Sequence, residues 1–309
     1  MTYSFVIPIY NEAESLPELR RRLLPILNGL DGVAEVVLVN DGSRDGSLDI
    51  IRKICAEDDR FKCLEFSRNF GHQIAITAGM DHTSGDAIII LDADLQDPPE
   101  VVFSLIQKWK EGYEVVYAVR KSRQGESFFK KLTAKIYYRL LKRLSQIDIP
   151  LDTGDFRLVD RKALDAFLSM REGHRFVRGM FTWIGFRQIG VEFERAERFA
   201  GETHYPLKKM MKLAADGILS FSYVPLRLVL SAGAWIALAS ILGALYAVVG
   251  YFRGQTVQGW ASIFVLVSFL GGVQLIVMGM LGEYIGRIHE EVKRRPLYLI
   301  REQIGFKKP

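Results

Sequence analysis

Residues 87–99 read AIIILDADLQDPP, and this stretch indicates the fold class. Ala87–Leu91 is apolar throughout, as in a strand that is covered on both faces, and Asp92 and Asp94 follow where that strand must end. The Pro-Pro pair after them suits the first turn of a helix. A buried strand, a polar turn and a new helix are typical of a mainly parallel α/β sheet.

The same alternation runs through the first half of the chain. Helix-compatible segments lie near residues 13–29, 45–57, 71–83 and 98–111. Apolar runs separate them: Tyr3–Ile9, Glu35–Val39, Cys63–Phe66, Ala87–Leu91 and Glu114–Ala118. In such folds ligands bind at the carboxyl ends of the strands. The residues that follow each strand are therefore the candidate site: Pro8–Glu12, Asn40–Ser43, Ser67–His72, Asp92–Asp97 and Arg120.

Composition excludes several classes of protein. The 309 residues include 41 Lys+Arg and 36 Asp+Glu, a formal net charge of +5, and most charges precede residue 227. Two long uncharged stretches follow, which excludes a disordered chain and an ordinary fully soluble enzyme. Cys55 and Cys63 are the only cysteines, so a disulfide scaffold is excluded and a reducing compartment is expected. The first residues lack a basic, apolar leader, so we expect no signal peptide and a cytosolic N-terminal part.

The two uncharged stretches predict membrane-spanning helices. Leu228–Phe252 has 25 residues and Trp260–Gly282 has 23. At a rise of about 1.5 Å per residue, each can cross a hydrocarbon core of about 30 Å. Lys and Arg crowd the outer flanks, whereas the connecting turn Arg253–Gly259 holds one charge. The sequence therefore predicts a multi-pass hairpin in the inner (cytoplasmic) membrane, with both chain ends and the catalytic domain in the cytoplasm.

Two basic, amphipathic segments, Glu126–Leu144 and Leu207–Phe221, precede the hairpin. They suit either solvated surface helices or helices that lie on an anionic bilayer, and the apolar stretches that follow favour the bilayer. The expected layout is a sheet domain (1–200), interface helices (201–227), two transmembrane helices (228–286) and a basic cytoplasmic tail (287–309). Small residues in the second span, such as Gly271 and Gly272, also favour a homo-oligomer.

Asp92 and Asp94 are candidate metal ligands. Two carboxylates one residue apart repel each other unless a cation or hydrogen-bond donors lie between them. Mg²⁺ uses one or two carboxylates together with substrate phosphates, although such a pair can equally form a turn or a helix cap. We find no HExxH zinc motif, no GxGxxG or P-loop nucleotide motif and no GxSxG nucleophile motif.

Two other strand-end turns carry polar groups. Asp41, in Asn40-Asp41-Gly42-Ser43, either caps the next helix or accepts hydrogen bonds from a nucleoside. In Pro8-Ile9-Tyr10-Asn11-Glu12, the same choice lies between a plain strand-to-helix turn and a nucleoside site with a stacking Tyr10 and an accepting Glu12.

Six ordered motifs give a specific resemblance. They are Val6–Glu12, Asn40–Ser43, Ser67–His72, Asp92–Pro99, Thr153–Leu158 and Arg198–Tyr205. In this order the chain resembles the inverting A-type glycosyltransferases that act on polyprenyl phosphates, which include dolichyl-phosphate mannose synthase. With its two-span tail it is most similar to the bactoprenol glucosyltransferases. The resemblance implies a Rossmann-like A-type glycosyltransferase domain followed by amphipathic helices and a transmembrane hairpin.

The resemblance also implies roles for individual residues. Asp92, Ala93 and Asp94 would face the diphosphate, with Mg²⁺ or Mn²⁺ on the two aspartates, and Asp155 matches the family's proposed catalytic base. The nucleotide sugar would be bound further by Pro8, Tyr10, Glu12, Asp41, Arg120, Arg198 and His204. Candidates for attracting the lipid phosphate are Arg123, Lys130, Lys131 and Lys135. The chain departs from the family at Thr203 and His204, where Ser and Lys are usual, so a pH-dependent phosphate contact is expected at His204.

The implied reaction transfers a hexose, best matched by glucose from UDP-glucose, to polyprenyl (undecaprenyl) phosphate with inversion at the anomeric carbon. Arg198 would assist departure of the diphosphate. Transfer of mannose or another sugar stays open. A processive polysaccharide synthase would carry QxxRW and more spans, and a non-catalytic scaffold would be expected to lose an aspartate of the pair; neither feature is present. The expected partners are the nucleotide sugar, the lipid phosphate and the membrane, with no nucleic acid.

Overall fold

A computed structural model describes residues 1–121, 153–194 and 259–306, together with single positions between 229 and 253. The chain forms two compact units, which are treated separately below. One unit comprises Met1–Ser220 and Pro296–Pro309, and the other comprises Phe221–Arg295.

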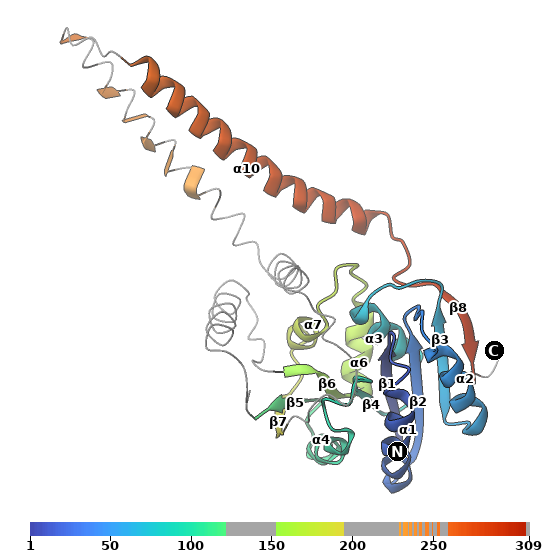
Figure 1. Cartoon of the computed structure of the whole chain (residues 1–309). Coiled ribbons are helices and arrows are strands. Elements are labelled where there is room, and N and C mark those ends of the chain that lie inside the picture. The colour runs from blue at the N-terminus through green and yellow to red at the C-terminus, as the bar shows by residue number, and fades with distance from the viewer. Residues whose placement is uncertain are drawn as a thin grey trace. The chain divides into compact units, whose positions relative to one another are not determined.

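The first unit is built on an eight-stranded sheet in the order β7-β5-β6-β4-β1-β2-β3-β8 (Figure 1). Neighbours are parallel from β4 through β1 and β2 to β3, and also between β5 and β7. The strands are β1 Thr2–Ile9, β2 Val33–Asn40, β3 Phe61–Phe66, β4 Ala87–Ile90, β5 Val115–Arg120, β6 Thr153–Asp160, β7 Gln188–Phe193 and β8 Ile300–Ile304. The expected mainly parallel α/β sheet is thus confirmed, and the five apolar runs are its first five strands.

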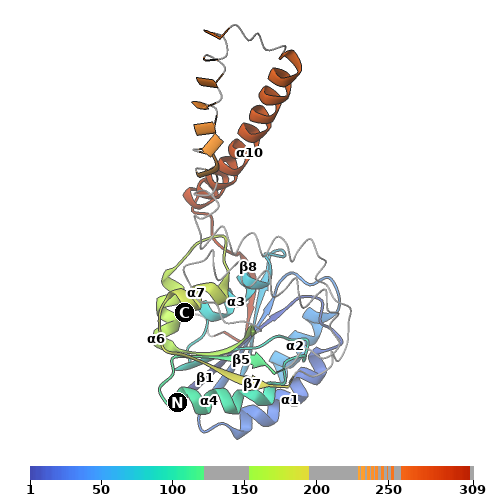
Figure 2. The ribbon, with the colours of Figure 1, turned by 90° about the vertical axis from the view of Figure 1, so that its left-hand side faces the viewer.

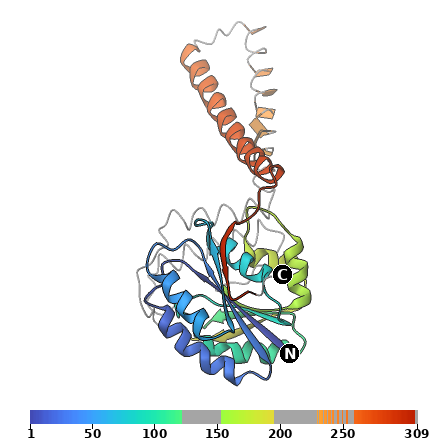
Figure 3. The ribbon, with the colours of Figure 1, turned by 90° about the vertical axis from the view of Figure 1, so that its right-hand side faces the viewer.

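Helices cover both faces of this sheet, as Figure 2 and Figure 3 show. Alternate residues of β2 separate the faces: Val36 and Leu38 pack with the apolar stripe of α1, whereas Val37 and Val39 pack with α3. This period of two is what a buried strand requires. The helices of the unit are α1 Leu16–Gly29, α2 Ser47–Glu57, α3 His72–Asp81, the 3₁₀ turn η1 Pro99–Val101, α4 Val102–Lys110, α6 Arg161–Ser169 and α7 Val177–Trp183.

Strand β6 is antiparallel and lies between β4 and β5, so the fourth and fifth apolar runs do not pair with each other. The pattern of apolar runs predicts no strand at residues 153–158, although these residues carry one of the six motifs. The register pairs Ala87 with Asp160 and Ile90 with Arg157. When this register is continued by two residues, Asp92 lies opposite Asp155.

The segment that we expected to be a basic tail enters the sheet. Residues Ile300–Ile304 form β8, which pairs antiparallel with β3, so the expectation of a tail is wrong for these residues (Figure 1). The Tyr298 ring stacks on Phe66 with 5.4 Å between centroids, and Ile300 packs against the α3 face of the sheet. Ile300 and Ile304 pack against different core clusters of the sheet, with the exposed Arg301, Glu302 and Gln303 between them, and in this way the strand covers the edge of β3.

The second unit contains the long helix α10, Trp260–Val292. Within the part of the chain that the structure describes, it is the one helix long and apolar enough to cross a membrane, with a candidate span at Phe269–Val292. The expected two-helix hairpin is not confirmed. Most of Leu228–Phe252 and both amphipathic segments lie outside the described residues, so those expectations stay predictions.

Candidate active site

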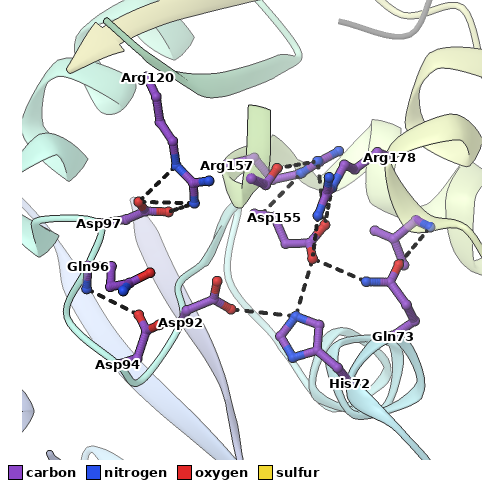
Figure 4. A network of polar contacts seen from close by, with 12 residues as sticks. His72, Gln73, Asp92, Asp94, Gln96, Asp97, Arg120, Asp155, Arg157 and Arg178 are labelled. Carbon is purple, nitrogen blue, oxygen red and sulfur yellow. Dashed lines mark hydrogen bonds and ion pairs between the residues drawn. The ribbon is translucent and has the colours of Figure 1, made fainter. Parts of the chain in front are cut away.

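Two of the predicted strand-end motifs, those that contain His72 and Asp92, meet residues of β6 and α7 in one polar network (Figure 4). Asp92 follows β4, His72 begins α3 after the β3 turn, and Asp155 lies in β6. The network forms here because β6 runs antiparallel to β4, which brings its first residues beside the carboxyl end of the parallel strand.

Asp92 lies where negative charge is poorly compensated. Its Oδ1 atom is buried and has no hydrogen-bond partner. Burial raises the pKa of Asp92 to about 6, and the charges of Asp155, Asp94 and Asp97 add to the rise, although His72 opposes it. Asp94 accepts a hydrogen bond at Oδ1 from the Gln96 amide at 3.1 Å. A buried carboxylate oxygen that accepts no hydrogen bond and has the His72 ring 3.5 Å away, close to further carboxylates, is a suitable position for an additional cation.

The residues of this loop fit a divalent metal that is also bound by substrate. Among residues 1–121, 153–194 and 259–306, no group of three or more His, Cys, Asp and Glu side chains is arranged to hold a metal ion. Asp92 and Asp94 would supply two carboxylates, and Mg²⁺ commonly takes its remaining ligands from phosphates and water. The predicted metal role of this pair stays a prediction that the geometry accommodates.

Asp155 has the opposite environment. Its side chain is only 4% exposed, and both carboxylate oxygens accept hydrogen bonds. Arg178 donates from Nε to Oδ1 at 2.9 Å and from Nη2 to Oδ2 at 3.4 Å, and Gln73 Nε2 donates to Oδ2 at 3.1 Å. Burial alone would raise the pKa of Asp155, but the charge of Arg178 and the hydrogen bonds from His72 and Arg178 hold it well below its usual range. A carboxylate in this state is a weak base.

His72 connects the two aspartates. Its Nε2 atom lies 3.2 Å from Asp155 Oδ2 and 3.5 Å from Asp92 Oδ1. Both neighbours are acceptors, so we assign a proton to Nε2. Burial would lower the pKa of His72, but the hydrogen bond to Asp155 and the charges of Asp92 and Asp155 raise it to about 9. The two carboxylates therefore favour the protonated imidazole.

His72 and Arg157 lie within motifs recognised in the sequence but had no predicted function, and neither Gln73 nor Arg178 was predicted at all. For His72 and Gln73 a usable signal was present, because they follow the β3 turn at the carboxyl edge of the sheet. Arg178 carried no such signal, since α7 follows no apolar run of the predicted pattern.

Arg157 lies beneath Asp155 and is 3% exposed. Its guanidinium donates to the main-chain oxygens of Gly154 at 3.2 Å and Asp155 at 3.3 Å, and Nη2 is 4.0 Å from Asp155 Oδ1. Burial lowers the pKa of Arg157 to about 10, and the Phe181 ring lies 5.0 Å from the guanidinium carbon. The charge remains in place at neutral pH and faces the buried side of Asp155.

Asp41 shapes the turn that leads to His72. It is 2% exposed, and its carboxylate accepts hydrogen bonds from the amides of Phe70 at 2.6 Å and Gly71 at 3.0 Å. Gly71, with φ of +102°, adopts a conformation that other residues rarely take, immediately before α3. Asp41 thus has a structural function, and its predicted contact with a nucleoside stays a prediction.

Arg120 is paired with a buried carboxylate. Its Nη2 lies 3.2 Å from Oδ2 of Asp97, which is 2% exposed. Gly154 makes room for this pair: a Cβ atom there would lie 3.1 Å from Arg120 Nη2 and 3.2 Å from Asp97 Oδ2. The pairing explains the glycine of the Thr153–Leu158 motif, while the predicted contact of Arg120 with the diphosphate stays a prediction.

The remaining predicted nucleoside residues line the same edge at the end of β1. Pro8 is buried within the strand, Tyr10 is 42% exposed, and Asn11 turns the chain with φ of +56°. The Glu12 amide donates to Ser47 Oγ at 3.0 Å. The exposed ring of Tyr10 is accessible for stacking. Ala93 is buried in the loop between the two aspartates.

Six predicted site residues lie outside the described residues. They are Arg198, His204, Arg123, Lys130, Lys131 and Lys135.

Comparison with known proteins gives concordant matches. The sequence profile described as "Glycosyl transferase family 2" matches residues 4–168. The chain is 52% identical over 308 residues to the uncharacterized glycosyltransferase YkcC of Bacillus subtilis (strain 168), which covers 98% of this chain and 94% of the relative. It is 41% identical over 303 residues to the bactoprenol glucosyl transferase of Shigella phage SfII, with 98% of each chain covered. Among solved structures, mannosyl-3-phosphoglycerate synthase from Rubrobacter xylanophilus matches with a TM-score of 0.49 and 19% identity over 74% of each chain.

Proposed function

Because this chain belongs to glycosyl transferase family 2 and is a glycosyltransferase, we propose that it transfers glucose from UDP-glucose to the phosphate of a polyprenol such as bactoprenol. The observation that carries the proposal is the 41% identity with a bactoprenol glucosyl transferase over 98% of both chains. The resemblance stated from the sequence motifs is confirmed at the level of this family. Beyond this family, we propose the identity of the donor, the identity of the acceptor and the functions of individual residues.

The donor would bind at the carboxyl edge formed by β1, β2 and β4. Tyr10 and Glu12 would contact the nucleoside, and Asp41 would hold the neighbouring turn in shape while contributing to the same pocket wall. Asp92 and Asp94 would hold Mg²⁺ or Mn²⁺, because the buried Oδ1 atom of Asp92 accepts no hydrogen bond and further carboxylates lie near it. When bound, such an ion neutralises the charge that develops on the departing diphosphate.

The proposed transfer needs no separate oxidant or co-reactant. A bond forms between an oxygen of the acceptor phosphate and the anomeric carbon, while the bond from that carbon to the β-phosphate oxygen breaks. UDP leaves with the electron pair, and attack from the opposite face inverts the carbon. A phosphate monoester has a second pKa near ~6, so the acceptor is largely dianionic at neutral pH.

The hydrogen bonding of Asp155 supports a role in orientation and not in proton transfer. Its two oxygens already accept hydrogen bonds from Arg178 and Gln73, and its pKa is held well below the usual range. We propose that Asp155 positions its neighbours while the dianionic acceptor attacks without losing a proton to the protein.

A membrane location fits the acceptor, whose polyprenyl chain resides in the bilayer. The apolar candidate span Phe269–Val292 supports membrane association of this chain. Two spans, cytoplasmic ends and a homo-oligomer remain predictions from the sequence.

The experiment is a transfer assay with the full-length chain in detergent. Undecaprenyl phosphate is incubated with radiolabelled UDP-glucose, UDP-N-acetylglucosamine or GDP-mannose in the presence of Mg²⁺ or Mn²⁺. We expect an organic-extractable product that carries one glucose per lipid. Preferential use of GDP-mannose would indicate a mannose synthase, and a growing polymer would indicate a processive synthase; either outcome would overturn the proposal.

A further inference from the structure

Four side chains around the start of β6 form a layered charge cluster. Asp155 and Arg157 form the inner layer, each with a side chain about 4% exposed. His72 and Arg178 form the outer layer, with side chains 39% and 24% exposed. The outer pair therefore reaches solvent, whereas the carboxylate that holds it does not.

We propose that His72 and Arg178 bind the phosphate of the lipid acceptor, and that Asp155 acts as the positioning residue that orients both side chains. The identity of the acceptor rests on the proposed function. The ligand chemistry is that of a phosphate monoester. Arg178 is the principal contact, because its guanidinium, held by Asp155, keeps its positive charge at any working pH.

The charges of the cluster favour an anion. Arg157 and Arg178 both carry permanent positive charge, and Asp155 is the one carboxylate among the four side chains of the cluster. The second carboxylate at His72 is Asp92, which would be compensated by the divalent ion of the donor site. A dianionic group that approaches the outer layer would therefore meet net positive charge.

The position of the cluster suits an attacking group. His72 Nε2 is 3.5 Å from Asp92 Oδ1, so a phosphate at the outer layer would lie next to the site proposed for the diphosphate. Inversion requires the acceptor and the diphosphate on opposite sides of the anomeric carbon. His72 lies between the metal-binding aspartate and Asp155, as Figure 4 shows, and so marks the boundary between the two phosphate positions.

Gln73 connects the two helices that contain His72 and Arg178, the residues of the outer layer. Its Nε2 donates to Asp155 Oδ2 at 3.1 Å, and its Oε1 accepts from the Val177 amide at 2.9 Å. Gln73 belongs to α3, as His72 does, and Val177 precedes Arg178 in α7. One side chain therefore fixes α3, β6 and α7 together, which limits the freedom that binding would otherwise have to remove.

The test compares Arg178→Gln, Arg178→Lys and His72→Gln with wild type in the full-length enzyme. The matched control is Arg171→Gln, which removes an arginine whose partner is Asp81 and not Asp155. For each protein we would measure the KM for undecaprenyl phosphate, the Kd for UDP with Mn²⁺, and the thermal midpoint.

We expect Arg178→Gln to raise the acceptor KM by about 10-fold or more, with the Kd for UDP within about twofold. Arg178→Lys should recover part of the loss, because it restores charge without the planar pair of donors. In wild type, inorganic phosphate should compete with the lipid and not with UDP-glucose. If Arg178→Gln fails to fold, Arg178→Lys and His72→Gln keep the inference testable, because each should also weaken this competition by phosphate.

Two results would overturn the inference while leaving the proposed function intact. One is an unchanged acceptor KM in folded Arg178→Gln and His72→Gln proteins that still make glucosylated lipid. The other is a loss of UDP affinity in place of acceptor affinity, which would assign the cluster to the donor. Failure of wild type to glucosylate undecaprenyl phosphate would instead overturn the proposed function.

Discussion

The aspartates at the end of β4 and the aspartate of β6 lie on neighbouring strands but have opposite environments. Asp92 has a buried oxygen that accepts no hydrogen bond, with the His72 ring 3.5 Å away, and its pKa is raised to about 6. Asp155 accepts hydrogen bonds at both oxygens, and its pKa is held well below its usual range. Both are carboxylates close to His72. The difference shows that the groups around a carboxylate decide its role. A carboxylate oxygen that accepts no hydrogen bond can bind a metal cation, whereas a carboxylate that already accepts hydrogen bonds from cationic side chains orients those side chains.

We expect the largest effect from Asp94→Asn, which tests the proposed metal site at the end of β4. We expect turnover to fall by about 100- to 1,000-fold, because charge on the departing diphosphate would lose its counter-ion. The free energy of unfolding should change by less than about 1 kcal/mol, since the side chain is partly exposed. Steady-state transfer assays and chemical denaturation would measure the two quantities.

Chelation provides the matched control for this prediction. EDTA should lower wild-type activity to a similar level, and added Mg²⁺ or Mn²⁺ should restore it. Full activity of Asp94→Asn in the presence of EDTA would show that the two aspartates do not need a metal ion.

Asp155→Asn should affect both stability and activity, in contrast to Asp94→Asn. The change leaves Arg157 and Arg178 without their shared carboxylate, and breaking a buried charged cluster costs about 3 kcal/mol. Transfer should fall by about 10- to 100-fold because the outer donors lose their orientation, while UDP binding persists. Calorimetry and UDP titration would separate the two effects. A fully stable Asp155→Asn protein would show that the contrast between the two aspartates is wrong.

A smaller effect should follow Gly154→Ala, which perturbs the Arg120–Asp97 pair beside β6. The added methyl carbon would lie 3.1 Å from Arg120 Nη2 and 3.2 Å from Asp97 Oδ2. We expect a loss of about 1–2 kcal/mol in the free energy of unfolding, because a buried pair must move apart.

Gly46→Ala is the control for this substitution, since a Cβ at that position meets nothing within 4 Å. Its effect should stay within about 0.5 kcal/mol. Equal losses in both variants would attribute the effect to the glycine backbone and not to the Arg120–Asp97 pair.

We expect the smallest effect at Glu35. Like Asp155, this carboxylate accepts several hydrogen bonds, but it lies outside the site and therefore serves as a reference. It accepts hydrogen bonds from Lys62, Ser4 and Ser84. Burial would raise the pKa of Glu35, but these donors lower it below its ordinary value of 4.5. A lowered folded pKa stabilises the protein above the unfolded value, and this contribution disappears as the pH falls.

Glu35→Gln should therefore cost about 1 kcal/mol at pH 7, and the cost should shrink as the pH drops below 4.5. Urea unfolding of wild type and variant between pH 7 and pH 3 would measure it. A cost that is constant over this range would contradict the pKa direction and indicate a packing effect alone.

Local patterns were sufficient for the framework of the fold. Ala87–Leu91 and the other apolar runs predict β1 to β5, because a strand that is buried on both faces must be apolar throughout. The polar turns after those strands predict the carboxyl-edge site, since parallel strands end on the same side of a sheet. Asp92 and Asp94 were therefore identified as a pair before any contact was known.

The tertiary structure alone decided which charges meet. Antiparallel β6 inserts between β4 and β5, and only this pairing brings Asp155 opposite Asp92 and next to His72, which is 83 residues away in the chain. Residues 300–304 join the sheet for a similar reason, because the edge of β3 accepts a strand from the far end of the sequence. Hydrophobic periodicity describes neighbours along the chain, whereas the partner of a buried charge depends on which distant strand fills the space beside it.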